Sequence, residues 1–156
     1  MALSKDEINF YNDQGYLLVE DVISENQHKE MLALVDGFFE KSKMIRENDN
    51  IFDLEDGHSS DNPRLKRIKH PHQQSQYLCY IIKESKIEEI LRDLLGDNVS
   101  LKTSKLNTKA PGGGAAVEWH QDWAFYPHTN DNVLALGLML NAVSYTHLRA
   151  HETKPN

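Results

Sequence analysis

The spacing of apolar residues changes near Gly96, and this change most limits how the chain can fold. Before Gly96, apolar residues recur three and four positions apart, as they do along one face of a helix. After it, compact apolar runs are separated by glycine, asparagine and aspartate, which is typical of strands and turns. A chain whose helices precede its strands is predicted to be an α+β protein.

Serine followed three positions later by glutamate or glutamine marks three helix starts. These capping boxes are Ser4–Glu7, Ser24–Gln27 and Ser85–Glu88, in which the serine caps a backbone N–H and the third residue reaches back. The helices that start at Ser4 and Ser85 are expected to end at Gly15 and Gly96, because glycine adopts the left-handed conformation of a C-cap. A further helix is expected over 75–83.

The remaining segments are predicted from local composition alone. Asparagine, aspartate, serine and glycine dominate residues 46–62, which indicates a long loop. β-favouring residues or unbroken apolar runs predict the strands, and glycine predicts a turn. The expected strands are 16–19, 99–108, 116–120 and 133–140, with the turn at 111–114.

Composition excludes several classes of protein. The 156 residues suffice for one domain, and the net charge of −7 comes with no concentrated basic face, which argues against a nucleic-acid partner. No run approaches the roughly 18 apolar residues that span a bilayer, and the polar start does not resemble a signal peptide. The single cysteine, Cys79, favours a reducing cytoplasm. The oligomeric state stays open.

His120 and Asp122 are the candidate metal ligands. On a strand, residues two positions apart point to the same side, so an imidazole and a carboxylate would face one ion. With one more histidine they would form the facial triad that holds Fe(II). The spacing alone is weak, since chance gives roughly 0.6 such pairs in a chain of this composition. His28 and Glu30 share the spacing but lie on a predicted helix, where they face apart.

Two separate stretches resemble the phytanoyl-CoA dioxygenase family. One is Pro111-Gly-Gly-Gly114, followed by Trp119-His-Gln-Asp-Trp123 and Phe125-Tyr-Pro-His-Thr-Asn-Asp131; the other is Phe10-Tyr-Asn-Asp-Gln-Gly-Tyr-Leu-Leu-Val-Glu-Asp-Val22. The resemblance implies a double-stranded β-helix, a cupin-like jelly roll, with helices packed outside. It also implies Fe(II), 2-oxoglutarate and O₂ as reaction partners, and hydroxylation of a small organic or acyl substrate whose identity is not implied.

The resemblance assigns roles by position. His120 and Asp122 would be two iron ligands. Lys109, Asn107 and Lys105 on the preceding strand would hold 2-oxoglutarate. Trp123 and Phe125 would line the substrate cleft, although both could equally pack in the core.

The chain departs from the family pattern after Asn141. The third ligand, a histidine, and the arginine that pairs with the far carboxylate of 2-oxoglutarate are both absent where the family has them. Residues 143–156 resemble translated sequencing-adapter read-through, so His147, Arg149 and His151 are not assigned to the site. We therefore expect residues 1–142 to be the front part of the family domain, incomplete at its C-terminus, and the chain as it stands to be inactive.

The alternative from the residues is a non-catalytic jelly-roll protein that binds a metal such as zinc, or an interaction domain. A charge-transfer absorption band on anaerobic addition of Fe(II) and 2-oxoglutarate would favour the oxygenase. Zinc retained without that band would favour the alternative.

Overall fold

The computed structural model describes residues 2–83, 85–109, 118–126, 129–130 and 132–141. The chain divides into two compact units, Met1–Gly114 and Ala115–Asn156, and each is described by itself. The predicted turn at 111–114, residues 116–117 of a predicted strand and the tail 143–156 lie outside the described residues.

The described residues of the first unit contain five helices. Their bounds are α1 Lys5–Gln14, α2 Glu25–Ser42, α3 Pro71–Gln74, α4 Gln76–Lys83 and α5 Lys86–Leu95. Of these, α1, α2, α4 and α5 match predicted helices, and α3 was not predicted. The capping boxes at Ser4 and Ser24 are confirmed, with both reciprocal bonds formed, and Gly15 ends α1 at a φ of 76°. Ser85 caps α5 through the N–H of Ile87, while Glu88 pairs instead with Arg92 one turn later.

Three short antiparallel strands form one sheet in the order β1-β2-β3. The strands are β1 Phe52–Leu54, β2 Leu65–Lys69 and β3 Lys105–Asn107. Only β3 lies within a predicted strand, the segment 99–108, and it covers three residues of it. β1 lies inside the segment predicted to be a loop, so that prediction is wrong for residues 52–54. The sheet forms because these segments complete each other's backbone hydrogen bonds, which composition does not reveal.

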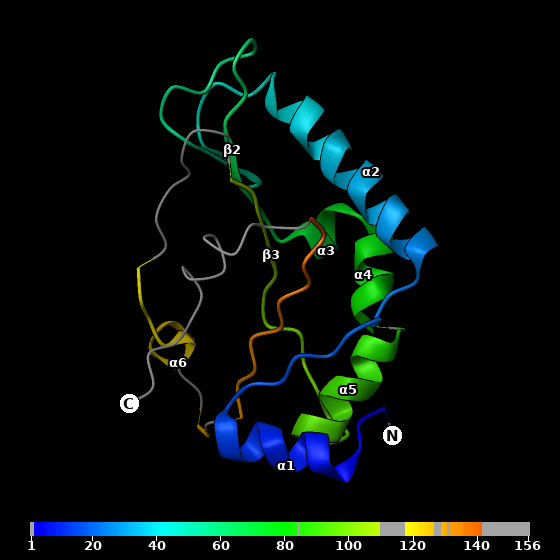
Figure 1. Cartoon of the computed structure of the whole chain (residues 1–156). Coiled ribbons are helices and arrows are strands. Elements are labelled where there is room, and N and C mark those ends of the chain that lie inside the picture. Colours follow the sequence, from blue (N-terminus) through cyan, green and yellow to red (C-terminus); the bar gives the residue numbers. More distant parts are fainter. Residues whose placement is uncertain (1, 84, 110–117, 127–128, 131, 142–156) are drawn as a thin grey trace. The chain divides into compact units, whose positions relative to one another are not determined.

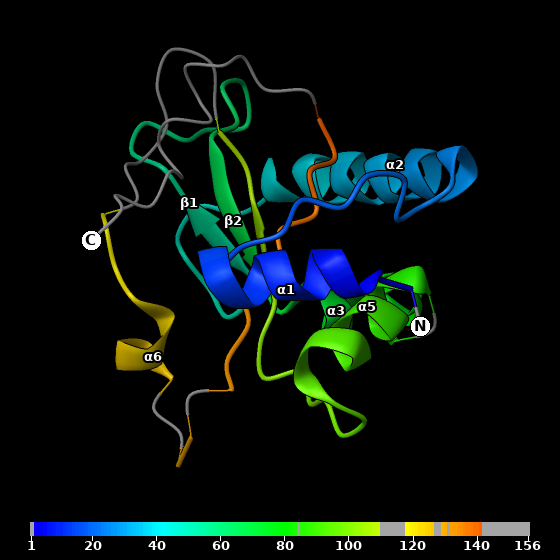
Figure 2. The ribbon, with the colours of Figure 1, turned by 60° about the horizontal axis from the view of Figure 1, so that its bottom comes forward.

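Apolar side chains from one face of the sheet pack with the helices. Phe52, Leu65 and Ile68 are buried, and Ile68 is 0% exposed. Figures 1 and 2 show α2 and α3 to α5 gathered on one side of the sheet. The helices contribute the rest of this core, and the segment before α1 adds one residue: Met31, Phe38, Leu78, Ile81, Ile87, Ile90 and Leu3. This packing leaves the other face of the sheet for polar residues.

The connection between α2 and β2 is held by a bridging histidine. His58 Nδ1 accepts a hydrogen bond from the N–H of Arg64 at 2.8 Å, and its Nε2 lies 3.0 Å from the carbonyl oxygen of Ser42. Because a backbone N–H can only donate and a carbonyl can only accept, the ring carries its proton on Nε2. Arg64 also pairs with Glu55 at 3.0 Å. These bonds fix the connection to Ser42 at the end of α2 and to Arg64 just before β2.

Two predicted strands are absent from the described residues. Residues 16–19 and 133–140 have no regular secondary structure, and their apolar side chains include Leu18, 78% exposed, and Met139, 65% exposed. An apolar run becomes a strand only where a partner supplies the opposite half of the hydrogen-bond ladder. No such partner pairs with either run within the part of the chain described here.

The α+β class is confirmed at this level, with helices and one antiparallel sheet. The described residues contain this sheet and no second one, so the double-stranded β-helix stays a prediction. Among these residues, no helix is both long and apolar enough to cross a bilayer.

Candidate functional site

The candidate metal ligands meet at the start of a short helix in the second unit. His120 precedes α6 Asp122–Phe125, and Asp122 is the first helical residue. The predicted strand geometry is therefore wrong for this pair, because the chain turns at Gln121 and enters a helix. The two side chains still converge, with His120 Nε2 3.6 Å from Asp122 Oδ1. The turn at Gln121, between these two residues, brings their side chains together, and no distant segment is needed.

The tautomer of His120 decides what this pair can hold. Its Nδ1 lies 2.7 Å from the carbonyl oxygen of Glu118, and since a carbonyl only accepts, Nδ1 carries the proton. In the neutral ring, Nε2 then presents a lone pair toward the carboxylate of Asp122. A nitrogen lone pair that faces a carboxylate oxygen is an arrangement in which both groups can bind one cation. A histidine whose other ring nitrogen is held by a carbonyl is also the usual arrangement of a metal ligand.

The donor set fits a divalent iron. One imidazole and one carboxylate are two of the three side chains in the 2-His-1-carboxylate triad. No group of three or more histidine, cysteine, aspartate or glutamate side chains converges among the described residues. The structure therefore brings together two candidate ligands, His120 and Asp122.

One aromatic ring packs against His120, and a second aromatic residue follows Asp122 in the chain. Phe125 meets the His120 ring edge to face, with 5.5 Å between ring centroids. Trp123 donates from its indole N–H to the carbonyl oxygen of Asn130 at 3.2 Å. Phe125 is 67% exposed and Trp123 49% exposed, so both present apolar surface beside the pair. Their role in holding a substrate stays a prediction.

Two of the three candidate cosubstrate residues lie on β3 in the first unit. Lys105 and Asn107 are two positions apart on this strand, share one face and are exposed. Lys109 follows the end of β3 and is also exposed, so the expected common strand face holds for Lys105 and Asn107 alone. Between Asn107 and Lys109, the N–H of Thr108 still bonds the carbonyl of Lys66 at 3.0 Å.

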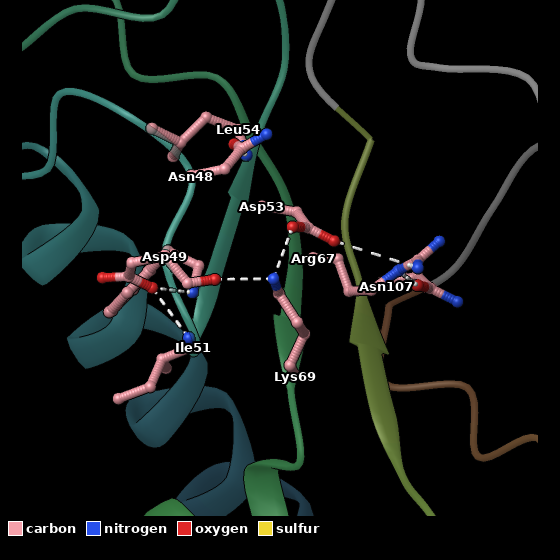
Figure 3. A network of polar contacts seen from close by, with 9 residues as sticks. Asn48, Asp49, Ile51, Asp53, Leu54, Arg67, Lys69 and Asn107 are labelled. Atoms are coloured by element: carbon pink, nitrogen blue, oxygen red, sulfur yellow. Dashed lines mark hydrogen bonds and ion pairs between the residues drawn. The ribbon is translucent and has the colours of Figure 1, made fainter.

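Asn107 belongs to a polar network that crosses the sheet (Figure 3). Arg67 donates from Nε to Asn107 Oδ1 at 3.1 Å, and its guanidinium lies 3.9 Å from Asp53 Oδ2. The other oxygen of Asp53 pairs with Lys69 at 2.9 Å. Lys69 in turn donates to the carbonyl oxygen of Asp49 at 2.6 Å. The sequence analysis missed Arg67 and Asp53, because only the strand pairing reveals that they adjoin Asn107.

The turn before β1 anchors this network. The carboxylate of Asp49 accepts hydrogen bonds from the N–H groups of Ile51 and Phe52 at 2.7 and 2.6 Å. The bond from Phe52, with a smaller contribution from Ile51 and the charge of Lys69, holds the pKa of Asp49 below its ordinary value. Asn48 adds a bond from the N–H of Leu54 at 2.8 Å. These bonds fix the backbone of the turn at Asp49, whose carbonyl oxygen accepts the hydrogen bond from Lys69.

Comparisons with known proteins point to one family. A sequence profile described as phytanoyl-CoA dioxygenase (PhyH) matches residues 11–146. The chain is 35% identical over 134 residues to a probable alpha-ketoglutarate-dependent hypophosphite dioxygenase of Stutzerimonas stutzeri, an alignment that covers 86% of this chain and 46% of the relative. It is 25% identical over 145 residues to an ectoine dioxygenase of Bordetella bronchiseptica, covering 93% of this chain and 45% of the relative. The chain thus spans a little under half the length of these curated relatives.

Proposed function

The chain belongs to the phytanoyl-CoA dioxygenase family, and from that membership we propose that it serves an Fe(II)- and 2-oxoglutarate-dependent hydroxylation. One observation carries the proposal: His120 Nε2 and Asp122 Oδ1 converge to 3.6 Å while the carbonyl of Glu118 fixes the ring tautomer. In the proposed reaction, substrate R–H, O₂ and 2-oxoglutarate give R–OH, succinate and CO₂. The relatives named as dioxygenases support this class.

His120 and Asp122 are the proposed iron ligands. The neutral imidazole donates its Nε2 lone pair, and the Glu118 carbonyl keeps the ring from turning. The carboxylate of Asp122 adds a negative charge that balances the cation. When bound, Fe(II) together with 2-oxoglutarate supplies the oxidising chemistry of the family. Trp123 and Phe125 exclude water from one side and orient the substrate through their exposed faces.

Lys105, Asn107 and Lys109 are proposed to bind 2-oxoglutarate. Lysine ammonium groups and the asparagine amide donate hydrogen bonds, and a dicarboxylate only accepts them. The exposure of all three side chains supports access for a small anion. A compact polar substrate is favoured over a long acyl chain, since the two relatives are named for hypophosphite and ectoine.

The domain assignment is also a proposal. Residues 1–142 are the N-terminal part of a jelly-roll domain of this family, and residues 143–156 lie outside it. With the two candidate ligands that the described residues bring together, we expect Fe(II) binding to be weak. The single cysteine, Cys79, supports a cytoplasmic location.

An anaerobic Fe(II) titration of the full chain tests the metal site. Amide NMR signals near His120 and Asp122 should broaden selectively, because Fe(II) is paramagnetic. His120→Ala and Asp122→Asn should abolish the broadening, while His28→Ala, which also removes one imidazole, should leave it unchanged. Broadening that persists in both site variants would overturn the assignment.

A second assay tests the reaction class. Addition of 2-oxoglutarate to the Fe(II)-loaded chain should produce a charge-transfer absorption band that His120→Ala removes. Succinate should not accumulate when hypophosphite or ectoine is supplied to the chain alone. Retained zinc with no such band would favour a non-catalytic metal-binding protein.

A further inference from the structure

One side chain from each strand forms a straight polar row across the sheet. Asp53 on β1 is the direct partner of Arg67 on β2, and Arg67 is the direct partner of Asn107 on β3. Directly opposed side chains on one face lie close enough to interact. The row thus places the guanidinium of Arg67 between a carboxylate and the amide of Asn107 (Figure 3).

Arg67 dictates which way the Asn107 amide is turned. A guanidinium has donors and no acceptor, so the atom that faces Arg67 Nε at 3.1 Å has to be the carbonyl oxygen Oδ1. The two N–H donors of Asn107 are then on the opposite branch of the amide. Because Asn107 is exposed, these donors are presented to a molecule from solution. The opposite turn of the amide would present an acceptor instead.

Arg67 is itself held on its other side. Asp53 lies 3.9 Å from its guanidinium, and Asp53 is held in turn by Lys69. The side chains of Arg67 and Asp53 are 28% and 22% exposed, so both are partly shielded from water. Shielded charge pairs with several partners restrict rotation more than single exposed contacts do. The orientation of Asn107 is thereby set by Arg67, forty positions earlier in the chain.

We propose that Arg67 is a positioning residue that turns the Asn107 amide so that its N–H donors face a carboxylate of 2-oxoglutarate. This inference rests on the proposed role of Asn107 in cosubstrate binding. Arg67 acts through Asn107 and does not touch the cosubstrate. Its loss lets the amide turn over, so that half of the orientations present Oδ1 to a carboxylate and repel it. Because half of the orientations remain productive, affinity for 2-oxoglutarate should then fall about twofold, while metal binding stays unchanged.

The test is a 2-oxoglutarate titration of the full chain, followed by NMR shifts of the Asn107 backbone and side-chain amides. Arg67→Met removes the donor and should weaken binding about twofold. Arg67→Lys keeps a cationic donor and should restore most of the affinity. Lys66→Met removes the same charge from the adjacent position, which faces the other side of the strand, and should leave affinity near that of the wild type.

A double variant separates this inference from the proposed function. In an Asn107→Ala background, Arg67→Met should have no further effect, because the residue through which it acts is gone. If Asn107→Ala weakens binding and Arg67→Met does not, the positioning role is overturned and the cosubstrate role stands. If neither variant changes binding, or the wild-type chain gives no saturable shift, both are overturned.

A second variant covers the case in which Arg67→Met does not fold. Asp53→Asn leaves Arg67 in place but removes the charge that holds its guanidinium. It should weaken 2-oxoglutarate binding by up to about twofold, the limit set by loss of Arg67, and leave Fe(II) binding unchanged. Wild-type affinity in a folded Asp53→Asn protein would overturn the proposal.

Discussion

The two candidate sites differ in how far along the chain their parts come from. His120, Asp122 and the Glu118 carbonyl lie within five consecutive residues. Asn107 depends on Arg67 and Asp53, which come from two other strands. The pair of candidate ligands, called the metal pair below, is formed by local structure. The polar row of Asp53, Arg67 and Asn107 is formed only when the three strands pair.

This difference has a consequence for stability. A local pair needs only the turn at Gln121 and the first residue of α6, so it can survive when distant packing is disturbed. The polar row needs three strands in register, and the register depends on the buried face beneath them. The two sites should therefore respond differently to the same changes.

The largest expected effect is a loss of stability in the sheet that leaves the His120–Asp122 pair intact. Ile68 is 0% exposed in the central strand β2, and Ile68→Ala should lower the free energy of unfolding by about 2 to 5 kcal/mol through lost burial and a cavity. Urea denaturation measures this loss. The variant should also weaken 2-oxoglutarate binding, while Fe(II) broadening at His120 persists.

Leu18→Ala is the matched control for this prediction. Leu18 is 78% exposed, so removal of its side chain should change the free energy of unfolding by less than about 0.5 kcal/mol. If Ile68→Ala abolished Fe(II) binding along with the sheet, the metal pair would not be a local structure.

An intermediate effect tests the local region alone. Phe125 packs edge to face on His120, and Phe125→Ala should weaken Fe(II) binding about threefold because the ring loses an aromatic neighbour. The NMR titration with Fe(II) measures the change, and Trp119→Ala, which removes another exposed aromatic, is the control. A change in the 2-oxoglutarate affinity of the metal-free Phe125→Ala chain would contradict the independence of the two groups of residues.

The smallest effect concerns the turn that anchors the polar row. Because the pKa of Asp49 is lowered from its ordinary value of 3.8, its carboxylate stabilises the fold above about pH 4 and loses this contribution as the pH falls below that value. Asp49→Asn should therefore be less stable than the wild type at pH 6, by less than about 1 kcal/mol because the side chain is exposed.

The pH dependence of this stability difference is the decisive part of the Asp49→Asn experiment. The stability difference between Asp49→Asn and the wild type should shrink as the pH falls through 3.8 toward 2. Asp97→Asn, at an exposed position after α5, is the matched control. A difference that stayed constant with pH would show that the charge of Asp49 does not stabilise the turn.

Local signals in the sequence were sufficient for the starts of α1, α2 and α5. The capping boxes at Ser4 and Ser24 and the glycine at position 15 act within a few residues of themselves, and each is found where it was predicted. The α+β class follows from the same signals. The convergence of His120 and Asp122 was also expected, although a turn and a helix produce it where a strand was predicted.

Strands were predicted poorly because an apolar run does not identify its own partner. Residues 16–19 and 133–140 have the composition of strands and no ladder among the described residues, whereas residues 52–54 pair with β2 from within a polar segment. The hydrogen bonds that stabilise a strand lie on another segment, so composition cannot show whether they form.

The sequence by itself thus determined the starts of α1, α2 and α5, the α+β class and the closeness of the candidate ligands His120 and Asp122, since all of these depend on residues a few positions apart. Only the tertiary structure decided that Arg67 faces Asn107 and that Asp53 faces Arg67. The physical reason is that strand register is set by the burial of Phe52, Leu65 and Ile68 together, and no single segment contains all three.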